Sequence, residues 1–178
     1  DILIKNGQIE DISDKIHISN IPEIDAGEHF VTSPFVDSHF HMDATLSYGL
    51  PRINQSGTLL EGINLWGELK KDLTPDAIKD RARKLCKWSI ARGTLGIRTH
   101  VDISGDNLMA VEALLDIKNE MKEFLDIQLV AFPQDGLYRA NCIDNLQNSL
   151  ELGVDVVGGI PHFERTMADG AAAPSAIV

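Results

Sequence analysis

The chain has 178 residues, of which 43% are hydrophobic, and a formal net charge of −11 at pH 7. These values predict one globular unit, with room for a small appendage, and the dispersed negative charge argues against a nucleic-acid partner. The two cysteines lack C-x-x-C spacing, which favours a reducing compartment. No apolar stretch is long enough for a bilayer and no signal-peptide pattern opens the chain, so we expect a cytoplasmic protein without a membrane partner.

Residues 1–30 are predicted to form a small β layer. Apolar and polar residues alternate on both sides of Asn6-Gly7, the dipeptide most typical of a tight hairpin turn. His17 and His29 belong to this segment and are expected at the surface. Residues 31–178 follow a different pattern, in which strands alternate with helices, and are assigned to a second unit.

Clear signals mark the helix ends in residues 31–178. Four helices are expected. The first opens with a capping box, the second with a threonine followed by a first-turn proline, and the other two with an aspartate each. Glycines are expected to end two of the four. These residues are Thr58 with Glu61, Thr74 with Pro75, Asp106, Asp144, and then Gly93 and Gly153.

Four runs of strand character alternate with these helices. Strands separated by helices of this length form βαβ crossovers and a parallel sheet, either doubly wound or part of a (β/α)8 TIM barrel. Each run carries polar residues at its C-terminal end, which is typical of the catalytic rim of a barrel, and no G-x-G-x-x-G follows the first run. The runs are 33–41, 95–102, 126–136 and 154–163, and their polar residues are His39 and His41, His100 and Asp102, Gln134, and His162 and Glu164.

The H-F-H sequence at the end of the first run is a candidate metal site. In a strand, residues two apart share a face, so His39 and His41 are expected to project together with Asp37. Two adjacent imidazoles can bind one divalent ion. The alternative is that one histidine belongs to the core and the other is solvated.

The second and third runs carry possible supporting groups. His100 and Asp102 could orient a water or a metal ligand through hydrogen bonds, unless Asp102 simply pairs with Arg98 inside the fold. Gln134 lies on a loop stiffened by Pro133 and suits recognition of an amide-like ring edge, or else faces water.

Two absent motifs limit the kinds of reaction that the chain could catalyse, and the last run adds two polar residues. His162 and Glu164 lie in an expected rim loop, where the alternative is a salt link between Glu164 and Arg165. The chain lacks H-x-E with P-C-x-x-C, which excludes the zinc deaminase fold that uses those motifs. It also lacks G-x-S-x-G, so covalent acyl transfer has little support.

Several motifs resemble the bacterial cytosine deaminases of the amidohydrolase superfamily. They are "PFVDSHFHMDAT", "NQSGTLLEGI", "RTHVD", the segment Leu129–Gln134 and "GVDVVGGIPHFE", within residues 24–170. The resemblance implies a (β/α)8 barrel flanked by a small β-sandwich from both chain ends, and one catalytic iron or zinc ion. It also implies that His39 and His41 are metal ligands, that Gln134 reads the pyrimidine carbonyl and ring nitrogen, and that Phe132 adjoins it in the substrate site.

The resemblance also predicts what these residues lack. The family takes its third metal histidine and catalytic glutamate from strand five, another histidine from strand six and a metal-binding aspartate from strand eight, so we expect the N-terminal half of such an enzyme. Two histidines alone would leave a metal with too few ligands, and we expect no catalysis by this half unaided. The segment after Ala172 is not expected to open the amphipathic helix of the family.

Three functions remain open from the sequence. The first is deamination of cytosine or a related heterocycle, in which a metal-activated hydroxide attacks the amine-bearing carbon and releases ammonia. The second is a truncated, non-catalytic half-barrel that pairs with a partner chain or with itself. The third is a related amidohydrolase acting on a triazine, isoguanine or a cyclic amide. Because the half-barrel would leave open sheet edges, we expect a homo-oligomer.

Overall fold

The structure is a computed structural model that describes residues 1–177. It divides into two compact units, Asp1–Ser33 and Pro34–Val178, and each is described by itself. No helix among the described residues is long and apolar enough to cross a bilayer.

The first unit contains a β-hairpin. Strands β1 (Ile2–Lys5) and β2 (Gln8–Ile12) pair antiparallel on either side of Asn6 and Gly7, whose φ angles are 53° and 73°. Two consecutive positive φ angles are what a two-residue turn of type I′ requires, so the predicted hairpin is confirmed.

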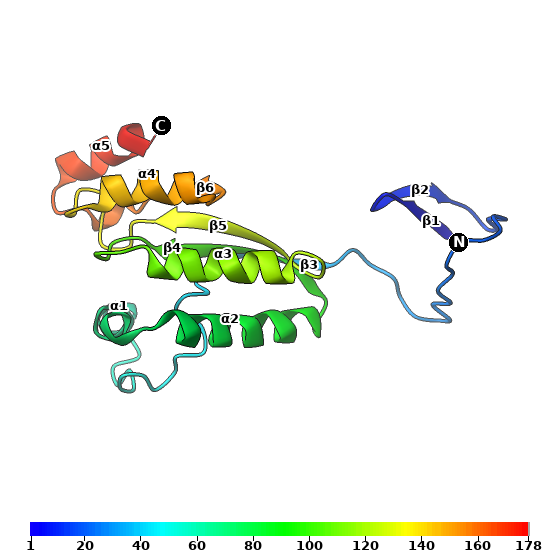
Figure 1. Cartoon of the computed structure of the whole chain (residues 1–178), viewed down its shortest axis with the longest axis horizontal. Helices are drawn as coiled ribbons and strands as arrows, with labels where there is room; N and C mark the ends of the chain where they lie inside the picture. The colour runs from blue at the N-terminus through cyan, green and yellow to red at the C-terminus, as the bar shows by residue number, and fades with distance from the viewer. Residues whose placement is uncertain (178) are drawn as a thin grey trace. The chain divides into compact units, whose positions relative to one another are not determined.

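The second unit is built on a four-stranded parallel sheet in the order β3-β4-β5-β6. Helices α2 and α3 run alongside each other over this sheet (Figure 1). The predicted α/β pattern with parallel strands is therefore confirmed. The strands are β3 (Phe35–Phe40), β4 (Thr94–Asp102), β5 (Asp126–Phe132) and β6 (Val156–Val157), and the helices are α1 (Leu59–Leu69), η1 (Lys70–Asp72), α2 (Pro75–Ile90), α3 (Met109–Met121), α4 (Cys142–Leu152), η2 (Pro161–Phe163) and α5 (Met167–Ile177).

Two of the four predicted helix starts are confirmed. The side chains of Thr58 and Thr74 accept hydrogen bonds from the first turns of α1 and α2. The other two starts are wrong. Helix α3 begins at Met109, where the Asn107 side chain accepts the amide hydrogen bond instead of Asp106. Helix α4 begins at Cys142, two residues before Asp144.

The last predicted strand is much shorter than expected. Strand β6 comprises only Val156 and Val157, after which the Gly158 backbone N–H still donates to the Ala131 carbonyl of β5 at 2.9 Å and Pro161 starts the 3-10 turn η2. Proline cannot donate to a strand ladder, so the pairing does not resume at Pro161. Helix α5 begins at Met167 and continues to Ile177 with Pro174 inside it, so the segment after Ala172 extends this helix and does not open one of its own.

The core lies between the sheet and its helices. Ile97, Thr99 and Val101 of β4 are at most 3% exposed and face α2 and α3, whose buried residues include Ile78 and Ile117. The alternate residues of β4 project to the opposite face. That second face carries the candidate site.

Candidate metal centre

Three histidine side chains meet at the carboxyl ends of two neighbouring strands, and we call them the histidine cluster. His39 lies in β3, His41 directly follows that strand, and His100 lies near the end of β4. The three rings can each offer one nitrogen such that all three atoms lie within 4.8 Å of one another. Imidazole is a common ligand of zinc and iron. The sequence predicted two ligands here, and the structure adds His100 as a third donor.

The rings are packed closely enough to share one ion. His39 and His100 stack at 4.2 Å between ring centroids, and His41 lies 5.4 Å from each of them. The Nδ1 atom of His100 is 3.3 Å from the Phe40 carbonyl oxygen. Because a carbonyl only accepts, Nδ1 of His100 carries the proton in this bond, which leaves the lone pair of Nε2 for a cation.

A bulge in β3 sets the direction of the first two histidines. Asp37 and Phe40 are three residues apart, but they pair with β4 residues that are only two apart. The extra residue breaks the strict alternation that the sequence pattern assumed for Asp37. Its carboxylate accepts a hydrogen bond from the backbone N–H of His39 at 3.2 Å and is not among the candidate ligands found in residues 1–177.

The electrostatics of the cluster suit a cation. Burial, and then the neighbouring rings of His100 and His39, lower the pKa of His41 to about 4. Burial and His39 also lower the pKa of His100. At neutral pH both rings are therefore neutral and keep a free lone pair, whereas protons on adjacent rings would repel each other. One divalent ion would take up all three donors at once.

Hydrogen bonds from β4 and α2 fix the turn after His41. The backbone N–H of Met42 donates to the Thr99 hydroxyl at 2.8 Å, and the Asp43 carboxylate accepts from the Asp102 backbone at 2.9 Å. Arg81 of α2 donates to two carbonyl oxygens of the turn at 2.9 and 3.1 Å. Burial raises the pKa of Asp43 to about 7. These bonds fix the backbone directly beyond the histidine pair.

Asp102 is neither a candidate ligand nor the partner of Arg98. Its carboxylate accepts hydrogen bonds from Trp66 Nε1 at 2.7 Å and from Lys70 Nζ at 3.0 Å. Arg98 donates instead to Gln128 at 2.6 Å. The alternative of an Arg98–Asp102 ion pair is therefore wrong, and Asp102 links β4 to α1.

The structure brings one predicted substrate residue directly to the cluster. The Phe132 ring, at the end of β5, lies 5.6 Å from His41 and 5.3 Å from His100 in edge-to-face arrangements. Gln134 follows in the next loop, half-buried, with its backbone N–H donating to the Phe132 carbonyl at 2.9 Å. The Phe132 ring thus flanks the histidine cluster, and Gln134 begins the loop that follows two residues later.

The polar residues after β6 play a different part from the one expected. The Glu164 carboxylate accepts a hydrogen bond from the Leu137 backbone at 2.5 Å, and within residues 1–177 it forms no ion pair with Arg165. His162 is exposed on η2. His17 and His29 are exposed, as expected.

The family model for the amidohydrolase family matches residues 22–154 of the chain. The chain therefore belongs to the amidohydrolase family, and the resemblance that its motifs carry to cytosine deaminases is confirmed. The metal-dependent character that is general in this family agrees with a cluster of three imidazoles.

Particular relatives agree with this assignment. The chain is 36% identical over 175 residues to the N-isopropylammelide isopropyl amidohydrolase of Pseudomonas sp. (strain ADP), covering 93% of this chain and 42% of that protein. The fold of this chain is similar to that of 5-methylcytosine deaminase from Klebsiella pneumoniae in its crystal structure liganded with phosphonocytosine. That match has a TM-score of 0.87 and 37% identity, and it covers 99% of this chain and 44% of the other. The chain thus spans less than half the length of these relatives.

Sequence reasoning missed the groups that support the site. Trp66, Lys70 and Arg81 lie on helices and reach strand ends more than 30 residues away in the chain. Trp66 and Lys70 are four apart and therefore share a helix face, which was the available signal.

Proposed function

We propose that the protein is a metal-dependent hydrolase that removes the exocyclic amine of cytosine or a related nitrogen heterocycle and releases ammonia. The observation that carries this proposal is the cluster of three imidazole donors within 4.8 Å, at the carboxyl ends of parallel strands. His39 and His41 hold one iron or zinc ion, with His100 as the third donor. The names of the two relatives support a substrate of this class.

Each residue has a defined part in this proposal. When bound, the metal supplies Lewis-acid activation of water for hydrolysis. The Gln134 amide offers a donor and an acceptor to a ring carbonyl and ring nitrogen. Phe132 excludes water from one side of the histidine cluster, and the turn held by Asp43 and Arg81 keeps His41 in place.

The wider architecture is proposed on the same basis. The four strands form part of a (β/α)8 barrel, and the β1–β2 hairpin forms part of a small β-sandwich. Support comes from the parallel sheet and the fold match to the Klebsiella deaminase. We expect the protein to form a homo-oligomer in the cytoplasm. Its substrate is a small heterocycle and not nucleic acid.

A second candidate is a non-catalytic half-barrel that requires a partner chain. It is favoured by the open positions of β3 and β6 at the two edges of the sheet, because an unpaired edge strand can accept another strand. Light scattering on the purified protein separates the two ways in which such a half-barrel could be completed. A mass equal to that of a multiple of one chain supports the self-paired form, and a second polypeptide of different mass supports the partner chain.

The direct test is ammonia release from cytosine, 5-methylcytosine and isocytosine by a longer form of the protein that also carries the strands from which the family takes its remaining ligands, loaded with Zn²⁺ or Fe²⁺. We expect His39→Ala and His41→Ala to abolish both metal retention and turnover. The controls are His17→Ala and His29→Ala, which change exposed histidines of the first unit and should leave both properties intact. Unchanged metal content in the first two variants would refute the site, and no turnover by the wild type in that longer form would refute the deaminase assignment.

A further inference from the structure

One ammonium group joins the ends of two neighbouring strands. Lys70 lies where α1 gives way to η1, and its Nζ is 3.0 Å from Asp102 Oδ2 and 2.9 Å from Asp135 Oδ2. Asp102 is the last residue of β4, and Asp135 directly follows Gln134 in the loop after β5. Without a cation between them the two carboxylates would repel each other, so Lys70 holds both strand ends together.

The environment makes this link stronger than a surface ion pair. The side chain of Asp102 is 5% exposed and that of Lys70 is 22% exposed, while the Asp135 side chain at the loop end is 38% exposed, so the shielding is greatest on the Asp102 side. Burial alone would lower the pKa of Lys70, but Asp102 and Asp135 outweigh it and hold the pKa above its usual value. The ammonium therefore stays charged at neutral pH. Screening by water and salt is weaker at such a half-buried site than at the surface.

Other hydrogen bonds also hold the loop that carries Gln134 (residues 133–137, the Gln134 loop). The backbone N–H of Asp135 donates to the Ser104 hydroxyl at 2.9 Å, and that of Leu137 donates to Glu164 at 2.5 Å. Gly136 has a φ of 103°, and a Cβ there would lie 2.8 Å from Glu164. Of these contacts, only the Lys70 pair ties the loop to α1.

We propose that Lys70 is a positioning residue that holds the Gln134 loop against the end of β4 and thereby sets how tightly the heterocycle is bound. This inference rests on the proposed function, because Gln134 reads the ring in that proposal. Lys70 does not touch the substrate. It acts by fixing the backbone one residue beyond the amide that does.

The steady-state test uses two variants that break the link at different places. Lys70→Met removes the cation, and Asp135→Asn weakens only the loop end while the Lys70–Asp102 pair remains. Gln134 binds the ring in the ground state and the transition state alike, so we expect KM to rise about tenfold and kcat to change by less than about threefold. Lys70→Arg, whose guanidinium can reach both carboxylates, should recover most of the loss.

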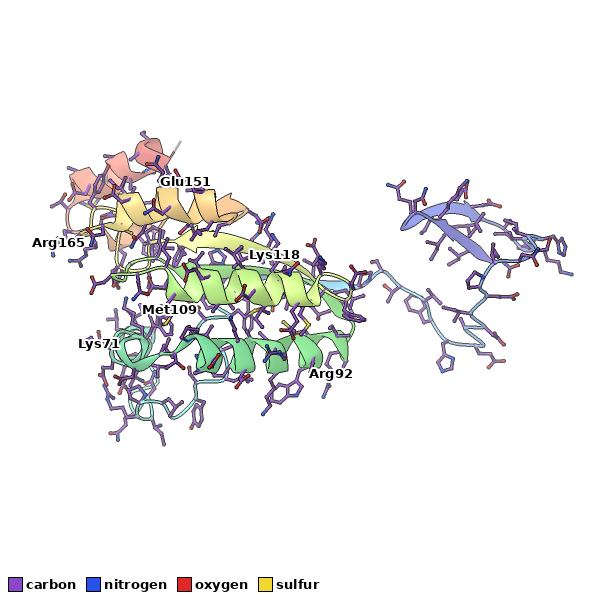
Figure 2. All side chains as sticks on the ribbon, in the orientation of Figure 1. Lys71, Arg92, Met109, Lys118, Glu151 and Arg165 are labelled. Carbon is purple, nitrogen blue, oxygen red and sulfur yellow. The ribbon has the colours of Figure 1, made fainter. Side chains whose placement is uncertain are left out.

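Lys71 supplies the matched control for lost charge. It is the next residue, it is exposed, and it forms no ion pair within residues 1–177. Figure 2 shows it at the η1 end of α1. Lys71→Met should leave KM, kcat and metal content at wild-type values.

A double-mutant cycle separates positioning from general destabilisation. If Lys70 acts through Gln134, then Gln134→Ala combined with Lys70→Met should raise KM no further than Gln134→Ala alone. Additive losses would overturn the proposal. A fall in kcat and metal content with no change in KM would overturn it as well, because that pattern indicates damage to the histidine cluster.

Amide hydrogen exchange tests the inference without any turnover. In Lys70→Met and in Asp135→Asn, residues 134–137 should exchange at least about tenfold faster, while the helix α3 amides keep their wild-type rates. Unchanged exchange in the Gln134 loop would overturn the positioning role even if the protein is a deaminase. Faster exchange in the longer form, if that form releases no ammonia, would leave the link standing and reject the proposed function.

Discussion

The two faces of β4 differ in what they contribute. Ile97, Thr99 and Val101 are at most 3% exposed and pack against the helices, whereas His100 and Asp102 point to the opposite side and make polar contacts. One strand therefore supplies both core packing and candidate chemistry through simple alternation. A substitution on the helix side should change stability, and one on the histidine side should change metal or substrate binding.

The largest expected effect is on the helix side. Ile97→Ala removes a side chain that is 3% exposed, and a cavity of this kind costs about 2–5 kcal/mol of unfolding free energy. The adjacent Arg98→Ala lies on the other face, is exposed, and should change stability by less than about 0.5 kcal/mol. Urea denaturation of both variants measures the difference. Equal losses would contradict the division between the faces.

A smaller effect is expected at Thr99, which faces the helices but bonds to the histidine-bearing turn. Thr99→Val removes the hydroxyl that accepts the Met42 amide at 2.8 Å and leaves a buried N–H unpaired, at a cost of about 1–3 kcal/mol. Thr99→Ser keeps the acceptor and should lose less. If the valine variant is as stable as wild type, this bond does not hold the turn.

On the histidine side, metal binding should change more than stability does. His100→Ala removes a half-buried ring and its hydrogen bond to the Phe40 carbonyl, and should lower the unfolding free energy by about 0.5–1.5 kcal/mol. Because it removes one of three donors, the affinity for Zn²⁺ should fall at least about tenfold. Calorimetric titration with Zn²⁺ measures this, with Arg98→Ala as the control. Wild-type affinity in the histidine variant would remove His100 from the ligand set.

The smallest effect concerns the two thiols. Burial raises the pKa of both Cys86 and Cys142 to about 11. A raised pKa keeps the thiols protonated below that pH, and protonated buried thiols react slowly. Neither should be labelled by a thiol reagent at pH 8 until the protein is unfolded. Rapid labelling of Cys86 would show that the helix side of the sheet opens readily.

Local signals in the sequence predicted much of the fold. Asn6-Gly7 dictates its turn through backbone conformation alone, and Thr58 and Thr74 cap helices with groups only three residues away. The prediction at Asp106 failed because the neighbouring Asn107 offers a similar acceptor and forms the bond that was assigned to Asp106. The prediction at Asp144 failed for another reason, since α4 begins after Asn141, which has a left-handed conformation, and without a side-chain cap. Short-range chemistry thus identifies an element better than it fixes the element's first residue.

The site was only partly predictable. His39 and His41 are two apart at the end of β3, so their closeness could be expected from the strand pattern, although His41 lies just beyond the strand. That His100 joins them depends on the register between β3 and β4 and on the bulge in β3. The partners of Asp102 lie 32 and 36 residues away, and only the packing of α1 decides between them and Arg98.

The bulge in β3 also has a consequence for how this segment tolerates change. Because one extra residue lies between Asp37 and Phe40, the number of residues in this stretch fixes which side chains face the histidine cluster. Substitution at Ser38, an exposed position, leaves that number intact. An insertion or deletion there would turn the following side chains to the opposite face of the sheet. In a library of variants, length changes between residues 37 and 41 should therefore be lost where many single substitutions survive.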